Sequence, residues 1–512
     1  MIPGSTVCFA CFNFQTTTQN LLYMNNLFRL GVKMVLLSAI IVMIPSCAVN
    51  PVTGKKQIML MSEAQEVQMG ASYDPQVVAT FGEYRNDRMQ TFAQSIANDM
   101  GKLSHRPNLT YHVKLLDSPV VNAFAVPGGY IYLTRGILAQ LNNEAELIGV
   151  IGHEMGHITS RHSVSQQSKQ QLGQLILTGG MIASEKFRSV AEYAMQGMQL
   201  LFLKYSRDDE RQADQLGVEY MSKVGYDAHK MADFFQVLNK MNMDSEHGGV
   251  PTFLSTHPDP GDRYSAVLQM AGDWHAKMPG TNWKVNQDAY LQMIDGIVYG
   301  EDPRQGFVEG NTFYHPDMKF RFNFPAGWQF QNAPTQVTMA PADGKALMVF
   351  TMAPQKTLEE AATATLQQLE LNVTDSRKTT VNGMPAIVAM STQSSQNQST
   401  GQAQTIRVMS YFIDNNGSYF VFHGVSSDAD FNAYTNLFQA NMGTFSKLTD
   451  PSKLNVQPQK LLVRKVARTG TLAEAFRTLG VPQNKMEEFA LLNNLELNST
   501  VQAGKLIKIV GK

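Results

Sequence analysis

Between residues 48 and 300, apolar residues recur mostly at the spacing of helices. Ser62, followed three residues later by Gln65, is typical of a capping box at the start of a helix. A second helix is predicted where apolar residues share one face over several turns: Met89, Phe92, Ala93, Ile96, Met100 and Leu103. This part of the chain is therefore expected to be mainly helical.

A small sheet is predicted within this helical region. Residues 111–115 alternate between apolar and polar side chains, as in a half-buried strand. Residues 120–126 and 130–134 are separated by Pro127-Gly128-Gly129, which favours a β-hairpin. The hairpin is expected to lie at the cleft of the helical domain.

Further along the chain the pattern becomes that of strands. Phe320, Phe322 and Phe324 alternate with polar residues. The turn sequence Asn415-Asn416-Gly417 separates two β-rich runs and predicts a second hairpin. The chain therefore contains a sheet-forming region after its helical one.

Proline- and glycine-containing segments divide the mature chain into domains and linkers: 48–300, linker 301–311, 312–447, linker 448–459, and 460–512. The last segment follows the order strand, helix, helix, strand. A length of 512 residues also predicts more than one domain. The fold class is predicted to be α+β.

Residues 1–47 are predicted to be a lipoprotein signal region, with translation starting at Met24. Arg29 and Lys33 precede an apolar run of 12 residues that ends just before Ser46 and Cys47. As a helix this run would span ~18 Å, too little for a hydrocarbon core of about 30 Å, so an export signal is favoured. The alternative is a secreted protein with a poor cleavage site.

Cys47 lies in a sequence that resembles a bacterial lipobox, Ile44-Pro45-Ser46-Cys47, so this Cys is predicted to carry a lipid that anchors the chain to a membrane. Ala48, rather than Asp, follows it and favours the outer membrane. The formal net charge of −1 provides no field that would attract nucleic acid, so a generic nucleic-acid binder is disfavoured.

Residues 151–157 contain the pattern HExxH, formed by His153, Glu154 and His157. Four residues are slightly more than one helical turn, so both imidazoles lie on one face and can bind one zinc ion. Glu154 lies beside them, where it can take a proton from zinc-bound water. Asn143 predicts the start of this helix. The alternative is a partly exposed helix with a chance His pair.

A catalytic zinc needs a third protein ligand and one open position. In the acidic segment 206–214, helical phase places Glu210 on a face with small and apolar residues and Asp208 on a polar face. Glu210 is therefore the candidate ligand. Asp214, one turn later, could orient a ligating His. The alternative is a solvated, charged helix.

Two other histidines, His257 and His162, are further candidates for the site. His257 lies in a proline-rich turn, followed by Arg263, and could reach a site across a cleft. From the residues alone, a surface position is favoured for His257. His162 lies five residues after His157, off the ligand face, and is predicted to be a hydrogen-bonded structural residue.

Taken together, the stretches GHEMGH, SRDDERQAD and STHPDPGDR resemble the gluzincin metallopeptidase family that includes HtpX and the CAAX-prenyl endopeptidases. The sequences that begin at Cys47 and at Asn122 resemble its periplasmic lipoprotein branch. The similarity covers about residues 48–300 and implies a zincin-type fold.

The resemblance implies three ligands for one Zn²⁺ per chain: His153, His157 and Glu210. It implies a general base, Glu154, and three further residues at the site: Asp214, His257 and Arg263. It also implies that substrate pairs as an added β-strand with an edge formed by Asn122, Ala123 and Phe124.

The implied function is a zinc-dependent endopeptidase on the periplasmic side of the bacterial envelope, which hydrolyses peptide bonds with zinc-activated water. Its expected role is envelope protein quality control, with unfolded or misassembled envelope proteins as substrates. The alternative is a chaperone-like or cell-wall-binding lipoprotein with little proteolytic turnover.

The accessory regions show weaker resemblances. Residues 312–447 resemble a PsbP-like α/β domain, without a catalytic cluster. Residues 460–512 resemble a LysM-like module, which implies contact with peptidoglycan. The alternative for this module is a packing role against the other domains.

Overall fold

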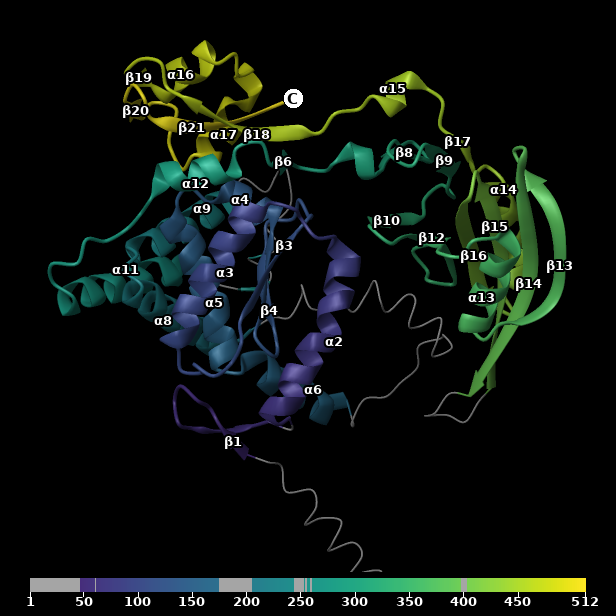
Figure 1. Ribbon diagram of the computed structural model, residues 1–512, viewed down its shortest axis with the longest axis horizontal. Coiled ribbons are helices and arrows are strands. Elements are labelled where there is room, and N and C mark those ends of the chain that lie inside the picture. The colour runs from purple at the N-terminus through teal and green to yellow at the C-terminus, as the bar shows by residue number, and fades with distance from the viewer. Residues whose placement is uncertain are drawn as a thin grey trace, which may run out of the picture.

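The computed structural model describes most of the chain, namely residues 47–59, 61–174, 205–243, 253, 256–257, 260–396 and 403–512. Apart from Cys47, the predicted signal region lies outside the described residues. Figure 1 shows a helical body, a sheet-rich body drawn in green beyond helix α2, and a small yellow module that lies against the helical body. No described helix is both long and apolar enough to cross a bilayer.

The helical body contains a three-stranded sheet, and its elements are β1 (Cys47–Val49), β2 (Lys56–Ile58), α2 (Glu63–Phe81), α3 (Asp87–Lys102), β3 (His112–Leu116), β4 (Ala123–Val126), β5 (Tyr130–Thr134), α4 (Arg135–Gln140), α5 (Glu144–Thr159), α6 (His162–Gln174), α8 (Arg207–Lys223), α9 (His229–Met243), α11 (Pro260–Lys277) and α12 (Gln287–Ile294). Strand β5 lies centrally, parallel to β3 and antiparallel to β4. The predicted hairpin and the capping box of Ser62 and Gln65 are confirmed.

Helix α5, which carries HExxH, is the central helix of this body, since each of its residues is buried. The side chain of Asn143 accepts a hydrogen bond from the Glu146 amide, so the predicted helix start is confirmed. Helix α8 packs closely along α5 because glycines line the contact. A Cβ atom on Gly156 would lie 2.8 Å from the Cα of Ala213. This close approach brings the first turn of α8 to the histidines of α5.

The sheet-rich body is a seven-stranded antiparallel sheet in the order β10-β11-β12-β16-β15-β14-β13, with a four-stranded sheet, β17-β9-β8-β7, packed beside it. Its elements are η2 (Pro303–Gln305), β7 (Phe307–Glu309), β8 (Thr312–His315), β9 (Phe320–Asn323), β10 (Gln329–Ala333), β11 (Gln336–Ala340), β12 (Ala346–Ala353), α13 (Leu358–Gln368), β13 (Asn372–Val381), β14 (Met384–Gln396), β15 (Ala403–Asn415), β16 (Ser418–Ser427), α14 (Phe431–Met442), β17 (Ser446–Lys447) and α15 (Pro451–Leu454). The hairpin predicted at Asn415-Asn416-Gly417 is confirmed. The segment predicted as linker 301–311 contributes η2 and β7, and β7 pairs with β8.

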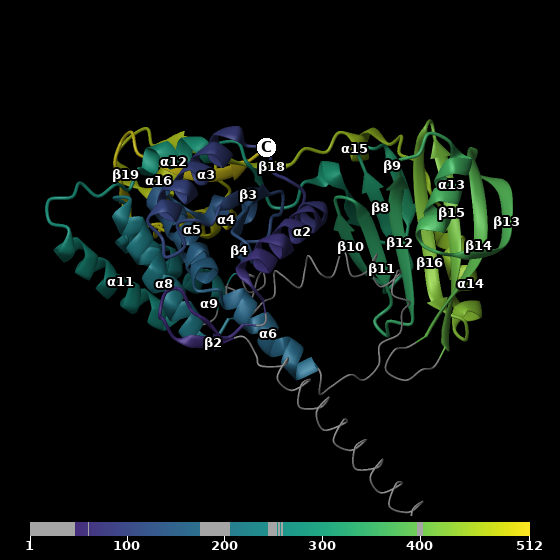
Figure 2. The ribbon, with the colours of Figure 1, turned by 60° about the horizontal axis from the view of Figure 1, so that its bottom comes forward.

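The yellow module has the predicted order strand, helix, helix, strand, with a short additional strand pair: β18 (Gln459–Lys465), β19 (Gly470–Thr471), α16 (Leu472–Thr478), η3 (Gln483–Lys485), α17 (Met486–Leu492), β20 (Thr500–Val501) and β21 (Leu506–Gly511). Strand β18 also pairs with β6 (Val298–Tyr299) of the helical body. Figure 2 shows from a second side that the module rests on this body.

The contact between the module and the helical body is buried and specific. Leu461, Leu492 and Leu506 belong to the same apolar core as α5. The fully buried Lys508 donates hydrogen bonds from Nζ to the carbonyls of residues 139–141, at 2.9, 3.1 and 2.9 Å. These carbonyls end α4 and have no partner within that helix, so the ammonium group serves as their cap.

Candidate metal centre

Four buried side chains converge inside the helical body. His153 and His157 come from α5, Glu210 from the first turn of α8, and His257 from the segment between α9 and α11. One donor atom of each lies within 4.8 Å of the others. The four side chains therefore form a single cluster, which we call the metal centre.

The distances between the donors fit a divalent metal ion. His153 Nε2 lies 3.1 Å from His157 Nε2, and His257 Nδ1 lies 3.2 Å from His153 Nε2 and 2.9 Å from Glu210 Oε1. Donors around a tetrahedral ion with bonds of 2.0–2.1 Å would be about 3.3 Å apart. Two imidazoles and a carboxylate are also the donors that zinc accepts. The residues present therefore fit a metal site.

The ring orientations of both α5 histidines are fixed from outside the cluster. His153 Nδ1 lies 2.9 Å from Asp214 Oδ1. His157 Nδ1 lies 3.0 Å from His162 Nδ1, and His162 Nε2 lies 2.9 Å from Gln212 Oε1. Such partners select the tautomer that presents Nε2 as an acceptor to a metal. Both α5 histidines thus have their Nε2 atoms directed into the centre.

Arg263 connects the carboxylates of α8. Its guanidinium donates two hydrogen bonds of 2.7 Å to Asp214, and its Nη1 lies 2.8 Å from Glu210 Oε2 without hydrogen-bond geometry. Burial raises the pKa of the Glu210 carboxyl, but His257 and Arg263 outweigh it and hold the pKa well below its usual range. Glu210 is therefore a charged carboxylate suited to a cation.

Glu154 is fully buried beside the metal centre, yet neither of its carboxylate oxygens has a hydrogen-bond partner among the described residues. His257 Nε2 lies 3.6 Å from Glu154 Oε1. Burial raises the pKa of the Glu154 carboxyl. A buried, unpartnered acid is costly unless something that the described protein atoms do not supply binds there.

The other candidate residues predicted from the sequence can be located in the structure. Asp208 points to solvent and pairs with Arg211, as its helical phase predicted. Ala123 and Phe124 are buried in β4, an edge strand of the sheet among the described residues, and the buried Asn122 directly precedes it. The surface position favoured for His257 from the residues alone is wrong, because this side chain is 1% exposed.

Two contacts of the centre were missed from the sequence. His162 is a hydrogen-bonded residue outside the ligand set, as predicted, but its contact with His157 was not foreseen: the backbone turns at Arg161, whose φ is +57°, and brings His162 back onto His157. The Tyr205 ring stacks on His157 with ring centroids 3.8 Å apart. Neither contact has a local signal, because helical periodicity does not extend past the end of α5.

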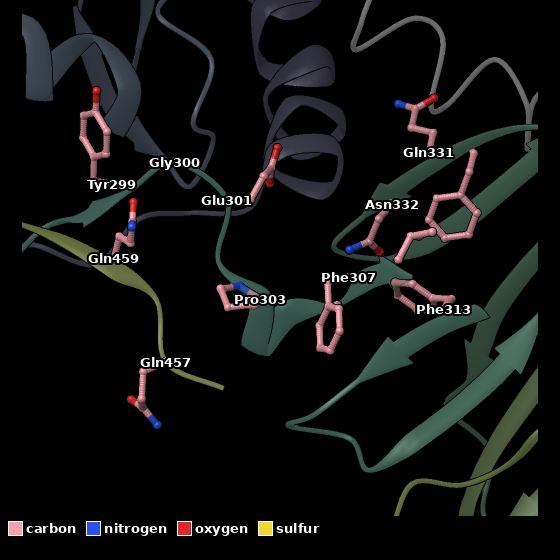
Figure 3. A pocket seen from close by; sticks show the side chains of 13 residues that line it. Tyr299, Gly300, Glu301, Pro303, Phe307, Phe313, Gln331, Asn332, Gln457 and Gln459 are labelled. Carbon is pink, nitrogen blue, oxygen red and sulfur yellow. The ribbon is translucent and has the colours of Figure 1, made fainter. Parts of the chain in front are cut away.

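A separate cavity of about 630 Å³ lies where the segments flanking η2 and β18 approach the sheet-rich body (Figure 3). Aromatic rings and carboxamides line it, including Phe307, Phe313, Asn332 and Gln457. None of its lining residues belongs to the metal centre. The cavity is therefore not part of the metal centre.

Comparison with known proteins agrees with this geometry. Residues 84–271 match the family model described as peptidase family M48. The chain is 25% identical to the beta-barrel assembly-enhancing protease of Yersinia pestis over 239 residues, which is 45% of this chain and 48% of that protein. It is 31% identical to the mitochondrial metalloendopeptidase OMA1 of Arabidopsis thaliana over 173 residues, 33% of each.

The chain spans about half the length of the first relative and a third of the second. Among solved structures, the cyanobacterial PsbP protein of Synechocystis sp. PCC 6803 is similar over 27% of this chain and 91% of its own, with 8% identity and a TM-score of 0.22. The family match covers α5, α8 and His257, which together supply the metal centre. Residues 84–271 of this chain therefore belong to peptidase family M48 and form a metallopeptidase domain.

Proposed function

We propose that the chain is a zinc-dependent endopeptidase of the bacterial periplasm. The observation that carries the proposal is the buried cluster of His153, His157 and Glu210 beside the unpartnered carboxylate of Glu154. The first three residues would hold the metal, and the fourth is free to act on a water molecule. Asp214 and Arg263 position the ligands. Asp214 contacts His153 and Arg263 contacts Glu210, but neither is one of the four converging donors.

A bound Zn²⁺ would polarise the scissile carbonyl and acidify a water molecule. Glu154 takes the proton of the attacking water at its carboxylate and later delivers it to the leaving amine. The peptide nitrogen leaves as a neutral amine, so the proton is conserved. Glu154 lies on the same helix as His153 and His157, so the helix fixes the position of its backbone relative to theirs.

Substrate is proposed to lie along β4 as an added strand. Val121, just before this edge, accepts a hydrogen bond of 3.2 Å from the amide of Phe253, whose ring stacks on His257. Phe253, four residues before His257, is therefore bonded beside the proposed substrate edge. Movement of Phe253 and His257 together would free the Val121 carbonyl and one donor position of the metal centre.

Activity is tested with the purified full chain and casein as an unfolded substrate. Cleavage that stops with a zinc chelator and returns with Zn²⁺ is the expected result. A folded, zinc-loaded chain that leaves casein intact would instead favour the chaperone-like alternative.

The proposed substrates are unfolded or misassembled envelope proteins. The name of the Yersinia pestis relative, beta-barrel assembly-enhancing protease, supports this class. A proteomic comparison of cells with wild type and with Glu154→Gln should reveal envelope proteins trapped on the variant. Contact with peptidoglycan through residues 460–512 stays a prediction, tested by sedimentation of the full chain with purified sacculi.

Replacement of His257 is expected to increase proteolysis. His257 supplies a fourth donor, and a fourth protein ligand would close the position that a catalytic zinc keeps open. His257→Ala should therefore raise the steady-state rate of casein cleavage. A decrease of about 10²-fold would assign His257 to oxyanion stabilisation instead. An unchanged rate would remove His257 from the mechanism.

Replacement of His162 is expected to weaken metal binding. His162 is the partner that orients the His157 ring, and loss of such partners typically weakens binding by about 10–100-fold. A chelator competition titration of His162→Ala should show this loss. His162→Asn, which keeps an acceptor near Nδ1, should recover part of it, and His112→Ala is the matched control outside the centre. Equal affinity in all three variants would contradict the role.

A lipid on Cys47 is expected to attach the protein to the outer membrane. Asn50, three residues after Cys47, is buried and donates a hydrogen bond of 3.3 Å to the carbonyl of Ser160, next to the end of α5. An acylated Cys47 would therefore hold the active domain close to the outer membrane. Cys47→Ala should yield soluble periplasmic protein or an unprocessed precursor on cell fractionation. Wild-type protein found entirely in the soluble fraction would refute the anchor.

A further inference from the structure

We propose a second metal site, formed by Asp227, His229 and His275 and remote from the peptidase chemistry. Asp227 lies two residues before the start of α9, His229 is the first residue of α9, and His275 lies in the last turn of α11. One donor atom of each lies within 4.8 Å of the others. We call this cluster the hairpin-base site, because it joins the start of α9 to the end of α11.

A nitrogen of each imidazole lies near one carboxylate oxygen. His229 Nδ1 lies 2.8 Å from Asp227 Oδ1, and His275 Nε2 lies 3.2 Å from the same oxygen. The two imidazole rings are 4.5 Å apart and nearly perpendicular, at 81°. The two nitrogen–oxygen distances, 2.8 and 3.2 Å, are close to the separation of about 3.3 Å between donors around one tetrahedral ion.

Hydrogen bonding alone does not account for the cluster. His275 Nε2 is shielded from solvent, yet it has no hydrogen-bond partner among the described residues, although the carboxylate is near. The nitrogen is therefore close to the oxygen without being aimed at it. Asp227 caps α9 through the His229 amide, at 3.1 Å, and this cap would need neither imidazole.

The donors are held in place before any ion binds. The His275 ring stacks on Trp283, with centroids 4.3 Å apart and planes 8° from parallel. The amide of Asp227 donates to the carbonyl of Lys284 at 3.0 Å, which fixes the turn. A preorganised site has little ordering cost left to oppose binding.

The chemistry suits a divalent transition metal. Two imidazoles and one carboxylate are ligands for Zn²⁺, Ni²⁺ or Cu²⁺. The side chains are 19–35% exposed, so water can complete the coordination. The two nearby lysine side chains have other partners than the Asp227 carboxylate. Lys230 pairs with Asp233 at 2.7 Å, and Lys284 lies over the Tyr226 ring.

The position of the site suggests a structural role. Helices α9 and α11 run in opposite directions, and the segment between their other ends carries His257. A metal at the hairpin-base site would fasten these helices at the end remote from His257. The proposal does not depend on peptidase activity, because its donors do not belong to the metal centre.

The test is metal stoichiometry of the full chain, stripped with a chelator and dialysed against Zn²⁺ at neutral pH. Wild type should bind two equivalents. His275→Ala and Asp227→Asn should each bind one, whereas the matched control His112→Ala should keep two. His157→Ala, which disrupts the metal centre, should retain the hairpin-base equivalent.

Circular dichroism of the metal-free variants checks that each still folds. With Cu²⁺ as probe, electron paramagnetic resonance should report nitrogen ligands that are lost in His275→Ala. One equivalent in wild type would overturn the proposal. So would a second equivalent that persists in either His275→Ala or Asp227→Asn.

Discussion

Replacing Glu154 with Gln is expected to abolish peptide hydrolysis while the zinc stays bound. Glutamine keeps the size of the side chain but cannot accept the proton of water, so the rate should fall by at least the ~10²–10⁴-fold typical of a lost general base. Metal should remain, because Glu154 is not one of the four converging donors. Casein cleavage and elemental analysis of the same preparation measure both quantities.

Thermal unfolding of Glu154→Gln is the control that shows whether the variant is still folded. Both oxygens of Glu154 are unpartnered, so the substitution breaks no hydrogen bond between described residues and should not lower thermal stability. Cleavage within a few-fold of wild type would show that another group accepts the proton, and the proposed mechanism would then fail.

Replacing Glu210 with Ala is expected to remove most of the bound zinc. Glu210 is 1% exposed and is the carboxylate of the metal centre, and its loss would also leave Arg263 Nη1 without its ion pair. Removing a partner of a buried charge is strongly destabilising, so metal content and thermal stability should both fall. Elemental analysis and thermal unfolding measure the two effects.

Asp208→Ala is the matched control for Glu210→Ala. Asp208 lies two residues earlier on the same helix, but its side chain is 87% exposed and pairs at the surface with Arg211. Exposed pairs of this kind contribute about 0–1 kcal/mol. Asp208→Ala should therefore keep its zinc. Equal metal loss from both variants would contradict the assignment of the two helix faces.

Local periodicity was sufficient to find the residues that lie on regular helices. HExxH predicts two histidines on one face of α5, and the phase of α8 predicts that Glu210 is buried and Asp208 exposed. The start of α5 at Asn143 follows from the same local chemistry. Which residues share a face of a helix depends only on the fixed helical repeat, so it can be predicted from their spacing in the sequence.

Contacts that depend on tertiary structure were not predictable in this way. His257 joins His153 across 104 residues of chain, and its proline-rich neighbourhood favours a surface turn. His162 reaches His157 because Arg161 adopts a left-handed conformation that an arginine seldom takes. The sequence predicts no role for the glycines of the HExxH helix, whereas in the structure α8 packs against Gly152 and Gly156.

Because Lys508 caps α4, the helical body can complete its packing only after the C-terminal module has been synthesised. Ala139 precedes its cap by 369 residues. At about 5–20 residues per second, α4 and α5 are synthesised roughly 20–70 s before the ammonium group that completes their packing. Throughout that interval the metallopeptidase domain lacks part of its core. Maturation of the domain is thus coupled to synthesis of a module that contributes no ligand to its metal centre.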